Sequence, residues 1–103
     1  MNLNELAKEI YNDNCRKGFY GESREDGTLI ALMHSELSEA LEADRKDLMD
    51  DKLTHRSGVE VELADCLIRI LDFCGYKNLD IQGAMEEKLV YNRTRPYKHG
   101  KKY

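Results

Sequence analysis

Two pairs of acidic residues are the part of this sequence best suited to chemistry. Glu36 and Glu39 form the pattern E-x-x-E, and Glu62 and Asp65 form the pattern E-x-x-D. Residues three positions apart project from the same face of an α-helix, so each pair presents two carboxylates side by side. If the two helices pack antiparallel with these faces together, four carboxylates converge at one place.

Converging carboxylates predict a metal centre, because like charges repel strongly in a site of low dielectric constant. Divalent cations neutralise such a cluster, and all-oxygen ligands select hard ions, so the expected cofactor is Mg²⁺ with Mn²⁺ as a substitute. The number of ions is left open. Di-iron bundles carry E-x-x-H motifs, which this sequence lacks: His34 lies two residues before Glu36.

The elements that position these residues are expected to be helices. Apolar residues recur at helical spacing in four segments, and no stretch alternates with the period of a strand. Gly75 is the expected C-cap of the third helix, Pro96 stops the fourth, and the polar stretch 47–57 is expected to hold at most a short helical turn. The predicted fold class is all-α, an antiparallel bundle of about four helices that oligomerisation completes, over residues 3–14, 28–46, 58–74 and 79–94.

The two acidic pairs differ in how strongly their surroundings argue for a function. Glu36 lies near the centre of the apolar face of its helix, where an unpaired carboxylate costs several kcal/mol unless it is protonated, ion-paired or metal-bound. A buried salt bridge to an Arg or Lys is therefore the alternative. On the third helix, an ordinary solvated face explains the charged stripe equally well by itself; that stripe comprises Glu62, Asp65, Arg69 and Asp72.

Composition bounds the class of protein. The chain has 103 residues, 41% hydrophobic and 35% charged, which indicates one globular domain, 1–103. All 20 Asp and Glu precede Lys88, while six of the 16 Lys and Arg lie from Lys88 onward, so the body carries −10 and the last 16 residues +6. An acidic body with a basic end does not suit a general nucleic-acid binder, so nucleic acid is not an expected partner.

Cysteine usage and hydropathy favour the cytoplasm. Cys15, Cys66 and Cys74 are odd in number and form no C-x-x-C pair, which argues against a disulfide framework and a zinc site. Cys66 and Cys74 fall in an apolar helical stretch and are expected to be core thiols. Neither a signal peptide nor a membrane span is recognised, so no membrane association is expected.

Substrate contacts are expected from three regions. Lys88, Asn92 and Arg95 lie on one helical stripe that can grip phosphates, although cations at a helix C-terminus also offset the macrodipole. Phe19, with its neighbour Tyr20, either stacks on a base or covers the end of the bundle. Arg69 shares the face of the second acidic pair, where it reaches the substrate or pairs with Asp72. The basic tail, 96–103, is expected to be mobile unless something holds it.

Three stretches resemble the MazG-like all-α nucleotide pyrophosphohydrolases: LIALMHSELSEALEADR, RSGVEVELADCLIRILD and EEKLVYNRTRPYKHGKKY. The ordered set is the E-x-x-E pair, 22 intervening residues, the E-x-x-D pair, the Lys-Asn-Arg helix and the HGKKY tail, over about residues 17–103. The resemblance implies Mg²⁺-dependent hydrolysis of a nucleoside triphosphate, or its deoxy form, to the monophosphate and pyrophosphate. It further implies that all four motif carboxylates bind metal and that Lys88, Asn92 and Arg95 contact phosphate or sugar.

Several alternatives stay open at this point. Many members of the family carry a Glu directly before the first motif Glu, where this chain has Ser35, so either Glu36 or Glu39 is the water-activating base. The preferred base and sugar are not predicted, and another pyrophosphate-containing molecule is an equally good substrate for the same site. The competing function is a non-enzymatic helical module that binds a partner or nucleic acid through the basic tail. A homodimer or higher oligomer is expected.

Overall fold

The computed structural model describes residues 2–96 and Lys102, and the predicted mobility of the remaining basic tail lies outside this part. The described chain is all-helical and contains no strand, which confirms the predicted class. Each helix begins and ends within three residues of its expected range: α1 (Leu3–Arg16), α2 (Asp26–Arg45), α3 (Gly58–Lys77) and α4 (Ile81–Arg93). None of these helices has the length and apolar character needed to cross a bilayer.

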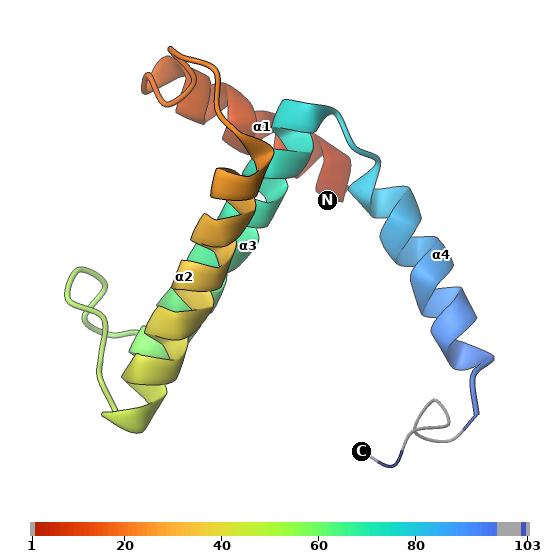
Figure 1. Cartoon of the computed structure of the whole chain (residues 1–103). Helices are drawn as coiled ribbons and strands as arrows, with labels where there is room; N and C mark the ends of the chain where they lie inside the picture. Colours follow the sequence, from red (N-terminus) through yellow and green to blue (C-terminus); the bar gives the residue numbers. More distant parts are fainter. Residues whose placement is uncertain (1, 97–101, 103) are drawn as a thin grey trace.

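An antiparallel hairpin of α2 and α3 is the centre of the fold and carries both acidic pairs (Figure 1). The connection between these helices contains no helix, and Met49 and Ser57 form an isolated antiparallel bridge that closes it. Ser57 then starts α3 with a capping box: its hydroxyl accepts from the backbone N–H of Glu60 at 3.2 Å, and the Glu60 carboxylate accepts from the backbone N–H of Ser57 at 3.1 Å. This cap fixes where α3 begins relative to α2.

A cluster of buried apolar residues lies where α1 crosses the C-terminal half of α3. Ala7 of α1 packs against Leu71 and Cys74 of α3, and these three residues are buried. The prediction that Gly75 caps α3 is wrong, because the helix continues to Lys77 and Asn78 takes the left-handed conformation at φ 54°. Gly75 serves instead as the point of closest approach: a Cβ there would lie 2.5 Å from the carbonyl oxygen of Ala7.

Helix α4 diverges from the rest of the molecule, so the bundle is open (Figure 1). Its attachment to α1 lies at its first turn, where Gln82 accepts from the backbone N–H of Leu3 at 2.9 Å and donates its own N–H to Asn4 at 3.0 Å. Beyond that turn α4 does not pack lengthwise on α2 or α3, and it buries no residue. The helix ends at Arg93, before Pro96 as expected.

The close packing at Gly75 makes a prediction that opposes helix propensity. Replacing a helical Gly by Ala normally stabilises a protein by up to about 1 kcal/mol. At position 75 the added methyl group collides with the backbone of α1, so Gly75→Ala is expected to lower the free energy of unfolding by about 1–3 kcal/mol. Chemical denaturation measures this change.

The control is Gly27→Ala in the first turn of α2, where nothing lies within 4 Å of the added Cβ. That variant is expected to be neutral or slightly stabilised. Equal stability of the two variants would mean that α1 does not approach α3 as described.

Candidate metal centre

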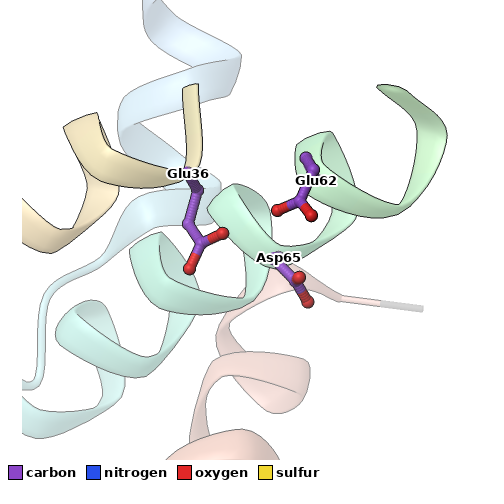
Figure 2. Close-up of side chains that lie close together, drawn as sticks. All are labelled: Glu36, Glu62 and Asp65. Atoms are coloured by element: carbon purple, nitrogen blue, oxygen red, sulfur yellow. The ribbon is translucent and has the colours of Figure 1, made fainter. Parts of the chain in front are cut away.

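Three of the four predicted carboxylates converge between α2 and α3. Figure 2 shows Glu36 on α2 turned toward Glu62 and Asp65 on α3, and one oxygen from each residue lies within 4.8 Å of the other two. The antiparallel hairpin causes this convergence, because it brings the middle of α2 alongside the first half of α3. The predicted facing of the two acidic patterns is therefore present for these three residues.

Glu39 lies at the edge of this cluster and is not one of its three members. Its side chain is exposed, and it lines with Glu62 a neighbouring hollow of about 330 Å³ near the connection from α2 to α3. Glu39 and Glu62 are nonetheless close enough to interact, since the Glu39 carboxylate contributes to the raised pKa of Glu62. The structure thus separates one accessible carboxylate from three enclosed ones.

Glu36 is the buried carboxylate that its position on the apolar face predicted, with 7% of its surface exposed. One oxygen, Oε1, accepts a hydrogen bond from the Arg69 Nε at 2.8 Å, so the salt-bridge alternative is realised at this oxygen. The other oxygen, Oε2, is buried and has no hydrogen-bond partner among the described residues. Arg69 therefore pairs with Glu36 and not with Asp72, whose carboxylate accepts from the Tyr20 hydroxyl at 2.7 Å.

The charged stripe of α3 faces α2 and not the solvent. Glu62, Asp65 and Arg69 are half-buried against the hairpin, whereas the apolar Leu63 and Leu67 on other sides of the helix are 44% and 60% exposed. This orientation removes the reading of the stripe as an ordinary solvated face. The inward orientation of these charged residues and the exposure of the leucines each require an explanation.

The electrostatics of the cluster follow from burial and from the crowding of like charges. Burial raises the pKa of Glu62 to about 8, and the Glu39 and Glu36 carboxylates add to this rise. Burial also raises the pKa of Asp65, with a further contribution from the Glu36 charge. Burial opposes ionisation of Glu36 as well, but the Arg69 guanidinium and the neighbouring Glu62 and Glu39 carboxyl groups outweigh it and hold the pKa of Glu36 below the usual value. At neutral pH without metal, Glu62 is therefore protonated while Glu36 is ionised.

The residues fit a hard divalent cation on the chemistry of their donors. The cluster offers oxygen atoms alone, and buried Oε2 atoms of both Glu36 and Glu62 lack a hydrogen-bond partner within residues 2–96. A buried carboxylate oxygen without a partner is costly, and a metal ion satisfies it. Glu36, Glu62 and Asp65 are the residues that would hold such an ion.

A cavity of about 500 Å³ opens beside the cluster and has the mixed lining of a ligand site. Arg69 and Phe19, which were predicted to contact a substrate, both line it, and Phe19 is 57% exposed. Arg24 and Asn14 also line it, and sequence reasoning missed both, because a lone Arg in a loop and a lone Asn at a helix end carry no pattern. Tyr20 is not free to stack on a ligand, since its ring packs at 4.9 Å from the Tyr11 ring and 4.6 Å from the Tyr76 ring.

The predicted phosphate grip on α4 is not part of this cavity. Lys88 and Asn92 lie on the diverging α4, Arg95 follows its C-terminal end, and none of the three lines the cavity beside the carboxylates. The Lys88 ammonium lies 4.7 Å from the centre of the Tyr91 ring, and the Arg95 guanidinium lies 5.7 Å from the same ring. Within one chain the structure therefore places these residues apart from the site they were expected to serve.

The raised pKa of Glu62 predicts that metal binding releases a proton near neutral pH. Because the ion needs the ionised carboxylate, the apparent affinity for Mn²⁺ or Mg²⁺ should rise about tenfold per pH unit from pH 6 and level off above about pH 8. Calorimetric titrations in buffers of different ionisation enthalpy count the released proton. Without metal the sign is opposite: protonation of Glu62 stabilises the folded state fully below about pH 4.5, and this contribution is lost as pH rises through 8. An affinity that does not change with pH would contradict the assignment of Glu62.

The ion pair of Arg69 with Glu36 predicts a stability difference between two arginines. Arg69→Gln leaves a buried carboxylate without its partner and is expected to lower the metal-free free energy of unfolding by about 1–3 kcal/mol at pH 7. The control is Arg56→Gln, which removes an exposed partner of Glu60 and should cost less than about 1 kcal/mol. Denaturant melts of both variants, with EDTA present, make the comparison; equal losses would argue against the pair.

The chain was also compared with known proteins. No protein-family model matches it, and neither the curated proteins nor the solved structures include a significant match. The assignment of the site therefore depends on the geometry of the described residues.

Proposed function

We propose that this protein hydrolyses a nucleoside triphosphate, or its deoxy form, to the monophosphate and pyrophosphate with the help of Mg²⁺ or Mn²⁺. The observation that supports the proposal is the convergence of Glu36, Glu62 and Asp65, with two unpartnered buried oxygens, beside a cavity that two arginines line. A carboxylate cluster next to guanidinium groups suits a substrate that carries several phosphates. The resemblance of the acidic patterns to the MazG-like enzymes points to the same reaction.

In this proposal the carboxylates divide into two roles. Glu36, Glu62 and Asp65 hold the metal, which supplies Lewis acidity and a water of lowered pKa. Glu39 is exposed beside Glu62 and outside the cluster of three, so it is the carboxylate that accepts a proton from the attacking water. In this proposal Glu39, and not Glu36, is the base that activates the water.

The cavity divides the substrate between charged and aromatic contacts. Arg69 and Arg24 stabilise the negative charge of the phosphates, and the exposed ring of Phe19 stacks on the base. Pockets of about 300–1,000 Å³ hold ligands of the size of a nucleotide, and the volume of about 500 Å³ falls within that range. The same contacts suit another molecule with a pyrophosphate linkage.

The state of the cysteines bears on the compartment in which the enzyme works. The buried Cys66 and Cys74 are unpaired, which is compatible with a reducing cytoplasm.

A non-enzymatic module that binds through the basic tail is the second candidate, but it gives no reason for a buried Glu36 or for inward-facing Glu62 and Asp65. We further propose that the enzyme works as a homo-oligomer.

The test is to incubate the protein with each ribonucleoside and deoxyribonucleoside triphosphate, with Mg²⁺ or with EDTA, and to identify the products by chromatography. The expected products are the monophosphate and pyrophosphate, and EDTA should abolish their formation. Glu36→Gln and Glu39→Gln are each expected to lower kcat/KM at least about 100-fold, since even residues that only support metal ligands contribute 10- to 100-fold.

The matched control is Glu9→Gln, an exposed carboxylate on α1 that lies outside the site and should leave kcat/KM unchanged. Diphosphate and orthophosphate as products would keep the metal site but overturn the cleavage position. A protein that turns over no nucleotide and gains no thermal stability from Mn²⁺ would support the non-enzymatic module instead.

A further inference from the structure

The Arg69 guanidinium takes part in two interactions that compete with each other. Its Nε donates to Glu36 Oε1 at 2.8 Å, and Glu36 is one of the three residues that would hold a cation. Arg69 also lines the cavity beside the cluster, where the proposed function gives it a phosphate to bind. A guanidinium that is paired with a carboxylate is already neutralised, so it binds a phosphate less well than a free one does.

In the metal-free protein, Arg69 supplies the positive charge that the carboxylates need. Glu36 is 7% exposed, and a carboxylate buried to this degree requires a compensating charge. Asp65 lies one helical turn before Arg69 on α3. Burial and the Glu36 charge raise the pKa of Asp65, and the positive charge of Arg69 opposes that rise. Arg69 therefore stabilises two of the three converging carboxylates in their ionised form.

This pairing becomes unnecessary when a divalent cation occupies the cluster. The ion would meet Glu36, Glu62 and Asp65, which each offer an oxygen within 4.8 Å of the others (Figure 2). Like charges repel, so a guanidinium that touches the Glu36 carboxylate opposes a doubly charged ion on the same residue. Arg69 and the cation consequently compete for Glu36, and the presence of one weakens the binding of the other.

Arg69 has both the exposure and the donors that a change of partner requires. Its side chain is 40% exposed and borders the cavity. Of its nitrogen atoms Nε alone is engaged, since neither Nη forms a hydrogen bond within the described part of the chain. A guanidinium carries five N–H donors in a planar fork that matches the oxygens of a phosphate. When Arg69 leaves Glu36, the cavity therefore gains a complete binding group for phosphate.

The position of Arg69 on α3 places it next to where a metal-bound phosphate would lie. Asp65 and Arg69 both line the cavity and are four residues apart on the same face of the helix. At a rise of about 1.5 Å per residue, Arg69 lies only about 6 Å along the helix from Asp65. A phosphate that contacts a cation on the cluster is therefore within reach of the Arg69 side chain.

We propose that Arg69 exchanges partners as the site fills: it pairs with Glu36 in the metal-free protein, and a phosphate of the substrate becomes its partner once the carboxylates hold a divalent cation. The exchange couples the two binding events, because the metal-free protein keeps this arginine on Glu36. Release from Glu36 depends on the metal site alone, whereas transfer to phosphate also rests on the proposed function.

Calorimetric titration with Mn²⁺ alone tests the release without any nucleotide. Because the guanidinium opposes the ion, Arg69→Gln is expected to raise the Mn²⁺ affinity at least about tenfold. The matched control is Arg24→Gln, which removes a guanidinium from the same cavity that contacts the Tyr20 ring, 5.8 Å from its centre. That variant should change the affinity less than about threefold, since solvent screens a charge that touches no metal ligand. An unchanged or lower Mn²⁺ affinity in Arg69→Gln would mean that Arg69 merely orients Glu36, and would overturn the exchange.

Nuclear magnetic resonance of arginine Nε–H groups follows the release in the wild-type chain. In EDTA the Arg69 signal, assigned by its loss in Arg69→Lys, should exchange slowly with water because Glu36 accepts its proton in a hydrogen bond. Saturation with Mg²⁺ should speed this exchange at least about tenfold, the loss expected for a hydrogen bond to a charged group. Unchanged protection in Mg²⁺, whether the ion binds beside an intact pair or does not bind, would overturn the release.

Inorganic pyrophosphate is the probe for the transfer to phosphate. In saturating Mg²⁺, Arg69→Gln is expected to weaken pyrophosphate binding at least about tenfold. In EDTA, the wild-type protein and Arg69→Gln should bind pyrophosphate equally weakly, while Arg24→Gln should weaken binding under both conditions. Equal affinities of the wild-type protein and Arg69→Gln in Mg²⁺, or equal losses with and without metal, would overturn the transfer. If this pattern holds but no nucleotide is turned over, the proposed reaction falls and the exchange stands.

Discussion

The Glu36 carboxylate, buried between α2 and α3, constrains how these two helices pack against each other. A buried anion requires compensation, and Arg69 supplies it at one oxygen at 2.8 Å, while the second oxygen has no partner in the described chain. Arg69 reaches Glu36 because the charged stripe of α3 faces α2. The convergence of Glu62 and Asp65 on the same point follows from this choice of face, as does the raised pKa of Glu62.

The inward turn of the charges has a cost on the opposite side of α3. A helix has only one circumference, so the side chains that α2 does not cover, such as Leu63 and Leu67, point to solvent. Because α4 is attached to α1 at its first turn, the described part of the chain leaves these leucines about half exposed. The inward-facing carboxylates and the exposed leucines are thus two consequences of one arrangement of α2 and α3.

The sequence predicts much of this structure from local patterns. Hydrophobic periodicity gives four helices to within three residues, and a carboxylate on an apolar face identifies Glu36 as buried. Prediction from local patterns fails where packing against another element determines the structure. The residue type of Gly75 predicts a helix end, yet Gly75 lies within α3, where the backbone of Ala7 leaves no room for a Cβ. Lys88 and Asn92 share one side of α4, but the spacing of two residues does not say which helix they face.

Local patterns in the sequence are therefore sufficient to predict the helices and the chemical character of each helix face. Spacing fixes which residues share a side of a helix, so the sequence predicts that Glu36 lies beside Glu39 and that Glu62 lies beside Asp65. Two features become visible in the folded chain alone. Glu36, Glu62 and Asp65 converge while Glu39 lies outside their cluster, and Arg24 and Asn14 line the neighbouring cavity with Phe19. The physical reason is that convergence depends on the crossing and register of two helices, which long-range packing sets and no local pattern encodes.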